Sequence, residues 1–359
     1  YIGEVEERVL RVDLAENSSA PLELVTGTPD NATLDGLVST NFPLDIPRGS
    51  ACDGKGNLYF VDLRAARVYR STAPDGEFPT IGPVETIAGS GGISVFTHRF
   101  DPSDDGRPAL EAQLNQPHDV ALDIDDNGEV RFVYIADTAS HRVRRVNLRA
   151  EGNLPAGSII TVAGSADPTS AFNSGIGSLE IRPNPSSPQP EVRSGSGDEP
   201  PTEDQLYLPT DVEVAPNGDV YIADYRNLRV RRLDVDTGEL TTVAGDGDVV
   251  FDEDSELGPT ERSVGWVAEM SMTPDGLLYF AGATEESPVR HSIWEYDTLA
   301  DTLREVTHVP LQRERAVTGL AAALVDGVTT LYFAVDFDDD VNENDSIFRA
   351  VLDPAGNVV

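Results

Sequence analysis

The stretch that decides the fold runs from Gln116 to Val146 and reads QPHDVALDIDDNGEVRFVYIADTASHRVRRV. It contains three short apolar runs, DVALD, VYIAD and HRVRRV, and a fourth run, ITVAG, ends at Gly164. The Asn127–Gly128 pair between the first two runs tolerates the positive φ that a tight hairpin needs. The pattern predicts a unit of four short antiparallel strands, which we letter A to D in chain order.

The same unit recurs along the chain. GNLYFVDLRAARVYR from Gly56 and GDVYIADYRNLRVRR from Gly218 align with VRFVYIADTASHRVRR from Val130 almost without gaps, and weaker copies start at Trp266 and Thr318. A four-stranded unit of roughly 40 residues buries both of its faces only by stacking radially against its neighbours. The repeats therefore predict an all-β fold, a β-propeller of four-stranded antiparallel blades in one domain.

The two ends of the chain resemble parts of one more unit. YIGEVEERVLRVDL from Tyr1, followed by LELVTG, reads as strands B, C and D, and the final LDPAGNVV reads as the missing strand A and its turn. We therefore expect six blades, with one blade closed by both chain termini. In the alternative, NVV is strand D of the fifth blade and the N-terminal blade is truncated. The expected blades span about 1–26 with the C-terminal end, 44–89, 115–164, 207–245, 264–309 and 317–359, with long insertions at 90–113 and 165–205.

The Gln116–Val146 stretch resembles the NHL repeat, and DGRPALEAQLNQP from Asp105 is similar to a segment common in bacterial NHL-repeat proteins. The resemblance is strong in three blades, partial in the N-terminal one and weak in the last two. It implies a β-propeller fold, usually six-bladed.

An Asp at the end of strand B is followed five residues later by an Arg at the start of strand C in each of the three strong copies. This spacing, and the family resemblance, predict that each pair bridges the B–C turn of its own blade as a fold device. The pairs are Asp62 and Arg67, Asp137 and Arg142, and Asp224 and Arg229.

The charge is strongly negative, with 63 acidic and 26 basic residues and a net charge of −37. Such a field repels phosphate backbones and anionic lipid surfaces, so nucleic-acid and membrane-surface binding are disfavoured. Lys55 is the single lysine, and an acidic, lysine-poor surface is typical of proteins from salty environments. We expect a halophilic or marine bacterial source and a secreted, periplasmic or cell-surface monomer, although acidity also serves solubility alone. The single cysteine, Cys52, is expected to be a buried small hydrophobe.

Four connections from strand D to the next strand A are unusually long: Thr28–Phe42, Ser90–Gln113, Ser165–Gln205 and Asp246–Ser263. In a propeller they lie on one face, beside the central channel where each strand A begins. Loops of this length are usually functional or disordered, so this face is the candidate binding surface.

The first residues of successive strands A are expected to meet at the channel mouth and to hold a small polar ligand or a metal. They are Arg48, His118, Asp119, Thr210, Asp211, Trp266 and Thr318. Two of them have structural alternatives: His118 as a residue of the repeat and Trp266 as a packing residue.

Calcium is the metal whose binding the sequence does not exclude. Of the five histidines only His98 and His118 could reach the mouth, which argues against a three-histidine zinc site. A second candidate is an acidic stretch with the D-x-D-x-D alternation of calcium loops, and its ligands would be Asp336, Asp338, Asp340 and Asn342. Val341 stands where such loops have Gly, so a solvated acidic turn is the alternative.

The sequence favours a binding or scaffold protein that recognises a protein, a glycan or a small ligand through the long-loop face. The alternative is a metal-dependent hydrolase or lyase, with calcium bound by Asp119, Asp211 and His118. The sequence contains no nucleophile elbow, zinc-protease motif, phosphate-binding loop or dinucleotide fingerprint, so it names no catalytic residue.

Overall fold

The structure is a computed structural model. It describes residues 2–4, 8–11, 23–26, 44–72, 83–91, 105–164, 206–248, 257–284, 291–309, 317–325, 327–335, 346–353 and 355–359. The chain divides into two compact units, Tyr1–Gly175 and Ile176–Val359, and each is described by itself.

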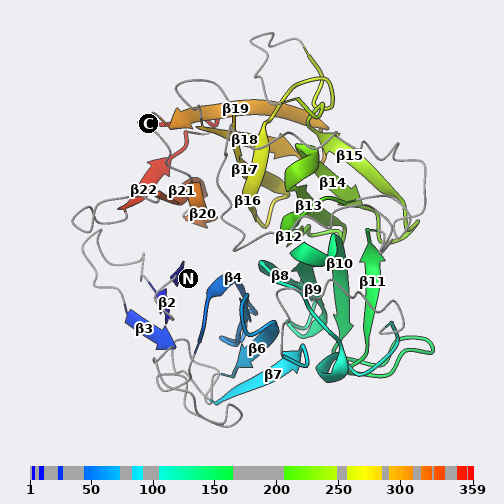
Figure 1. Ribbon diagram of the computed structural model, residues 1–359. Coiled ribbons are helices and arrows are strands. Elements are labelled where there is room, and N and C mark those ends of the chain that lie inside the picture. The colour runs from blue at the N-terminus through cyan, green and yellow to red at the C-terminus, as the bar shows by residue number, and fades with distance from the viewer. Residues whose placement is uncertain are drawn as a thin grey trace, which may run out of the picture. The chain divides into compact units, whose positions relative to one another are not determined.

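The first unit contains three antiparallel sheets (Figure 1). The N-terminal sheet has three strands, β1 (Ile2–Glu4), β2 (Arg8–Arg11) and β3 (Glu23–Thr26). The next sheet has β4 (Pro47–Cys52), β5 (Leu58–Asp62), β6 (Arg67–Ser71) and β7 (Val84–Ala88). The third has β8 (Asp119–Ile124), β9 (Val130–Asp137), β10 (Arg142–Asn147) and β11 (Ile159–Ala163). Short 3₁₀ helices η3 (Ala109–Glu111) and η4 (Thr138–Ser140) lie in the connections.

The second unit also contains three antiparallel sheets. The first has β12 (Pro209–Val214), β13 (Val220–Asp224), β14 (Arg229–Leu233) and β15 (Leu240–Ala244), with η5 (Tyr225–Asn227) between β13 and β14. The second has β16 (Trp266–Met272), β17 (Leu277–Ala283), β18 (His291–Asp297) and β19 (Thr302–Val309). The third has β20 (Val317–Val325), β21 (Val328–Val335) and β22 (Ser346–Val351).

The hairpin between strands A and B of the second blade forms at the Asn-Gly turn that the sequence predicts. Between β8 and β9, Gly128 has a φ of 74° and donates its N–H to the carbonyl of Asp125 at 2.8 Å. The Asp125 carboxylate accepts the N–H groups of Asn127 and Glu129, both at 2.9 Å, and these bonds and that of Arg149 lower the pKa of Asp125 to about 2.

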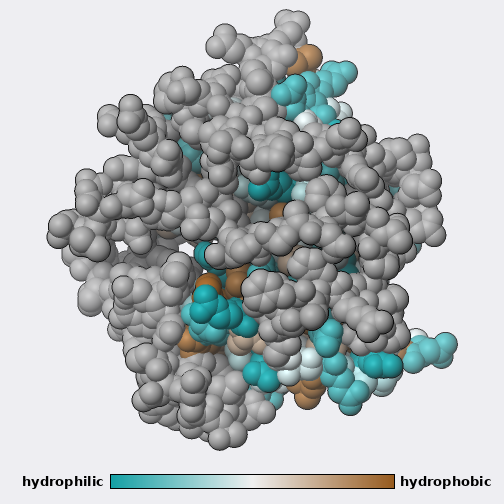
Figure 2. Space-filling view, viewed as in Figure 1, coloured by the Kyte–Doolittle hydropathy of each residue, from teal (hydrophilic) through white to brown (hydrophobic). Residues whose placement is uncertain are grey.

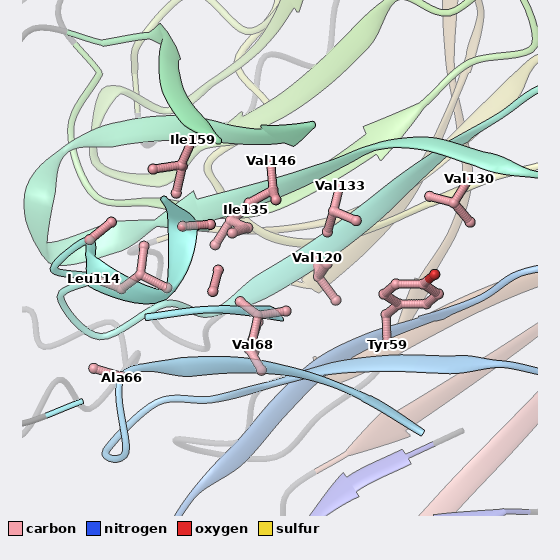
Figure 3. Close-up of a cluster of buried hydrophobic side chains, with 14 residues drawn as sticks. Tyr59, Ala66, Val68, Leu114, Val120, Val130, Val133, Ile135, Val146 and Ile159 are labelled. Atoms are coloured by element: carbon pink, nitrogen blue, oxygen red, sulfur yellow. The ribbon is translucent and has the colours of Figure 1, made fainter. Parts of the chain in front are cut away.

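Apolar side chains fill the space between neighbouring sheets. In the first unit, Tyr59 and Val68 from one sheet pack against Val120, Val133 and Ile135 from the next (Figure 3). In the second unit, the residues between the first two sheets form a cluster that includes Tyr221, Val267, Met270, Phe280 and Trp294. Burying each face against a neighbour is what stacked blades require.

The expectation of six blades, one of them closed by both termini, is wrong: the described residues form five blades. These are the sheets β4–β7, β8–β11, β12–β15, β16–β19 and β20–β22. The C-terminal segment is no strand A for the N-terminal sheet, which has only β1, β2 and β3 among the described residues. Instead it turns back on its own blade, where Leu352 bridges Val358 and the Val359 N–H donates to the Val351 carbonyl at 2.9 Å. The alternative made NVV strand D of the fifth blade, and these residues do turn back along β22, but the described residues form only an isolated bridge there and no fourth strand.

The Asp–Arg pairs of the repeat are cross-strand neighbours in all three blades, but their side chains differ. Arg142 Nε donates to Asp137 at 2.9 Å, and both side chains are buried. Arg67 donates instead to the carbonyl of Ser90 at 3.1 Å.

In the third blade, Arg229 donates to the carbonyls of Asn227 and Asp246, at 2.9 and 2.7 Å. Arg231 lies 3.5 Å from the Asp224 carboxylate. Burial raises the pKa of Asp224 to about 6, against the opposing effects of Arg231 and the hydrogen bonds.

Cys52 is exposed rather than buried, which corrects the expectation from sequence. It is the last residue of β4, at the start of the A–B turn. On the face shown in Figure 2, the described residues in view are mostly hydrophilic, with apolar ones in small groups between them.

We predict that Asp137→Ala lowers the free energy of unfolding by about 3 kcal/mol, because it removes a buried ion pair and the acceptor of a backbone N–H. Asp45→Ala is the control, since its pair with Arg64 at 3.2 Å is exposed and such pairs contribute about 1 kcal/mol or less. Urea unfolding measures both. Equal effects of the two substitutions would contradict the structural role of Asp137.

Candidate functional site

The Asp at the end of strand B holds the segment that leads into strand A of the same blade. Asp137 accepts the N–H of Asn115 at 2.6 Å, and Asp224 accepts the N–H of Tyr207 at 2.8 Å. Asp62 accepts the N–H groups of Asp45 and Ile46, at 2.7 and 3.1 Å. These bonds fix where the first residues of β4, β8 and β12 lie, and those residues are the candidate site.

In the first unit, the starts of β4 and β8 approach closely. The Gly49 N–H donates to the carbonyl of His118 at 2.8 Å, while the His118 N–H donates to the carbonyl of Ala136 at 3.1 Å. A Cβ on Gly49 would lie 1.7 Å from Asp119 Oδ1 and 2.8 Å from the Asp119 Cα. Only glycine allows this approach, which brings Arg48, His118 and Asp119 together.

His118 is a buried imidazole whose Nε2 atom has no hydrogen-bond partner in the described part of the chain. Its side chain is 5% exposed. Burial, together with the positive charge of Arg48, lowers the pKa of His118 to about 3, so the ring is neutral at physiological pH. A neutral ring offers one N–H donor and one acceptor nitrogen.

Gln116, two residues earlier, is a second buried polar group at this place. It is 8% exposed, and its Oε1 atom has no partner among the residues that the structure describes. Its φ of 49° is matched by 51° at Leu208, the residue before Pro209 in the next repeat. The left-handed backbone is therefore shared by these two repeats, whereas the Gln116 Oε1 atom without a described partner belongs to this blade.

In the second unit, Thr210 and Asp211 contact the next blade. Asp211 Oδ2 accepts the N–H of Met270 at 2.9 Å, and Thr210 Oγ1 donates to the carbonyl of Val267 at 3.4 Å. Both side chains are buried. Their contacts join β12 to β16.

Trp266 and Thr318 differ from each other in their surroundings. Trp266 is 4% exposed and packs with Tyr225, Leu228 and Ala283, which agrees with the packing alternative. Thr318, in β20, is exposed.

Thus Arg48, His118 and Asp119 lie together in one unit, and the remaining mouth candidates lie in the other. The proposed calcium ligands Asp336, Asp338, Asp340 and Asn342 lie outside the described residues, as does His98. Within the described ranges, no three His, Cys, Asp or Glu side chains are grouped closely enough to hold a metal ion. No helix in these ranges is long and apolar enough to cross a membrane.

Sequence reasoning missed Gln116 and Gly49. Gln116 belongs to the same QPH segment as His118, so its position was visible although its burial was not. Gly49 stands in an ordinary strand, and only the distance between β4 and β8 shows why the residue is glycine.

The antiparallel sheets, packed face to face within each unit, are the blades of a β-propeller. Residues 206–233 match the NHL repeat model. The third blade therefore contains a match to the NHL repeat, and the chain has the β-propeller fold. Comparison with curated protein sequences finds no match.

Solved structures similar to the chain include a chain of a nidogen/laminin complex, with 11% identity, a TM-score of 0.51, and coverage of 98% of this chain and 88% of that one. A gluconolactonase from Xanthomonas campestris has 13% identity and a TM-score of 0.45, covering 100% and 85% of the two chains. Virginiamycin B lyase from Staphylococcus aureus has 13% identity and a TM-score of 0.42, covering 87% and 68%. At this identity the likeness to the nidogen/laminin structure is one of fold.

We predict that the neutral, buried His118 makes stability depend on pH. Because the pKa of His118 is about 3 in the folded state and near 6.5 when unfolded, the unfolded state binds one more proton between these values. Stability therefore falls as the pH decreases through this window, by about 1.4 kcal/mol per pH unit from this residue. Urea unfolding between pH 4.5 and 6 should show a shallower pH slope for His118→Leu. The exposed His308 is the control, and an unchanged slope in His118→Leu would contradict the assignment.

We predict that Gly49→Ala destabilises the protein by about 1–3 kcal/mol, because the added methyl group overlaps the Asp119 backbone and carboxylate. Gly54→Ala is the matched control, since nothing lies within 4 Å of its added Cβ. Thermal and urea unfolding of both variants measure the difference. If Gly49→Ala behaved like Gly54→Ala, the close approach of β4 and β8 would be refuted.

Proposed function

We propose that this protein is a binding protein whose ligand carries an anionic oxygen group that contacts His118 and Arg48. The observation that supports the proposal is the buried His118 Nε2 atom without a partner, beside a guanidinium. An unsatisfied buried polar group costs about 1–3 kcal/mol, so folding alone gives no reason to keep it. A ligand oxygen that accepts the Nε2–H and faces Arg48 would recover this cost.

The electrostatics at this place favour an anion. The charge that acts on the His118 ring is the positive charge of Arg48. Carboxylates and phosphates match a guanidinium beside a neutral N–H donor. Such a group could belong to a small molecule or to a side chain of a partner protein. The fold is compatible with either, since a chain of similar fold occurs in the structure of a nidogen/laminin complex.

The alternative of a metal-dependent enzyme used Asp119, Asp211 and His118 as ligands of one ion. Asp211 already holds the backbone N–H of Met270, so its carboxylate has a structural role in the second unit. We therefore develop the binding function alone. The secreted or surface location stays a prediction from the sequence.

The direct test follows the His118 ring by ¹⁵N NMR while acetate or phosphate is added to the full chain. We expect the His118 ring signals to shift with saturation and those of His308 to stay in place. Arg48→Gln should weaken the response by at least tenfold, because it removes the cation that attracts the probe. If neither anion moves the His118 signals, the proposed function is overturned.

We further predict that His118→Leu abolishes this response yet raises the free energy of unfolding by about 1 kcal/mol at pH 7. The apolar side chain fills much of the same space and removes the unsatisfied nitrogen. Chemical denaturation of both proteins without added anions measures the change. A loss of stability of 2 kcal/mol or more would instead assign His118 a purely structural role.

A further inference from the structure

The residue that precedes the proline at the entry to strand A is polar in only one of the first three blades. It is Ile46 in the first blade, Gln116 in the second and Leu208 in the third. Gln116 and Leu208 have the same left-handed backbone, with φ of 49° and 51°, and both are buried, at 8% and 3% exposure. An apolar side chain therefore fits this position, and the backbone conformation does not require the amide of Gln116.

Two buried polar atoms without a partner among the described residues lie on either side of Pro117. They are Gln116 Oε1 and His118 Nε2. The corresponding side chains of the third blade leave no such pair, because Leu208 is apolar and Thr210 Oγ1 donates to the carbonyl of Val267 at 3.4 Å. A buried polar group without a hydrogen bond is costly and calls for a specific explanation. One ligand that contacts both atoms explains the two together.

The backbone on both sides of Pro117 is held in place. The Asn115 N–H donates to Asp137 Oδ1 at 2.6 Å, and the His118 N–H donates to the carbonyl of Ala136 at 3.1 Å. Two residues of chain span at most about 7 Å, so the α-carbons of Gln116 and His118 lie no further apart than that. A ligand of only a few heavy atoms can therefore contact both side chains.

The two atoms ask for different chemical groups. In the proposed function, the Nε2–H of His118 donates to an anionic oxygen. Gln116 Oε1 is an acceptor and needs a donor from the ligand. The positive charge of Arg48, which acts on the His118 ring, disfavours an ammonium group as that donor, whereas a hydroxyl group is a neutral donor.

We propose that the ligand is a hydroxy acid, whose carboxylate contacts His118 and Arg48 while its hydroxyl group donates to Gln116 Oε1. The inference rests on the proposed anion binding and names the class of anion. Gln116 is the residue that sets specificity, because a buried acceptor rejects an analogue that has no donor to offer.

The experiment compares acetate with glycolate, which differ by one hydroxyl group, in titrations of the full chain at pH 7 followed by the ¹⁵N signals of the His118 ring. We expect glycolate to bind about tenfold more tightly than acetate, since it makes one further hydrogen bond to a buried acceptor. Methoxyacetate keeps the added oxygen but has no O–H to donate, so it should bind no more tightly than acetate.

Gln116→Leu assigns the preference to this residue. It gives the second blade the residue that the third blade has at this position with the same φ, so we expect the variant to fold. The variant should bind acetate as the unsubstituted chain does and should bind glycolate no more tightly than acetate. Gln113→Leu is the matched control, because Gln113 is exposed three residues earlier, and it should retain the preference for glycolate.

The outcomes separate this inference from the proposed function. A response to acetate and glycolate with equal affinity would overturn the hydroxy-acid inference and leave anion binding in place. A preference for glycolate that methoxyacetate shares, or that persists in Gln116→Leu, would overturn it as well. If neither acetate nor glycolate moved the His118 signals, both proposals would fail together.

Discussion

The placement of the first residues of strand A depends on the carboxylate at the end of strand B. Asp62, Asp137 and Asp224 are all fully buried, and each accepts a backbone N–H from the segment that enters strand A. A buried carboxylate is tolerated only when its oxygens are satisfied, so it fixes that backbone. In the fourth blade Gly282 replaces the Asp, and a Cβ there would lie 2.0 Å from the Val264 carbonyl. The main chain itself fills the space of the missing carboxylate.

This constraint explains how neighbouring repeats acquire different roles at corresponding positions. His118 and Thr210 both follow a proline and both are buried. Thr210 contacts the carbonyl of Val267 in the next blade, whereas the Nε2 of His118 is left without a partner in the described structure. The hydrogen bonds to the strand-B carboxylates fix both backbones. The fold can therefore tolerate one unsatisfied side chain, because the surrounding hydrogen bonds and packing supply the stability. In the proposed function, this firmly held nitrogen is the group that contacts the oxygen of the ligand.

The sequence predicts what depends on local pattern and misses what depends on long-range geometry. Alternating apolar runs and Asn-Gly or Asp-Gly turns predict the strands well, as in β8, β9 and β10. The closure by both termini failed because LDPAGNVV fits two turns equally well, and only the Val351–Val359 hydrogen bond distinguishes them. The arginine partners differ between blades for a similar reason. Asp137 receives Arg142, while Arg67 reaches the Ser90 carbonyl, and a spacing of five residues is compatible with both.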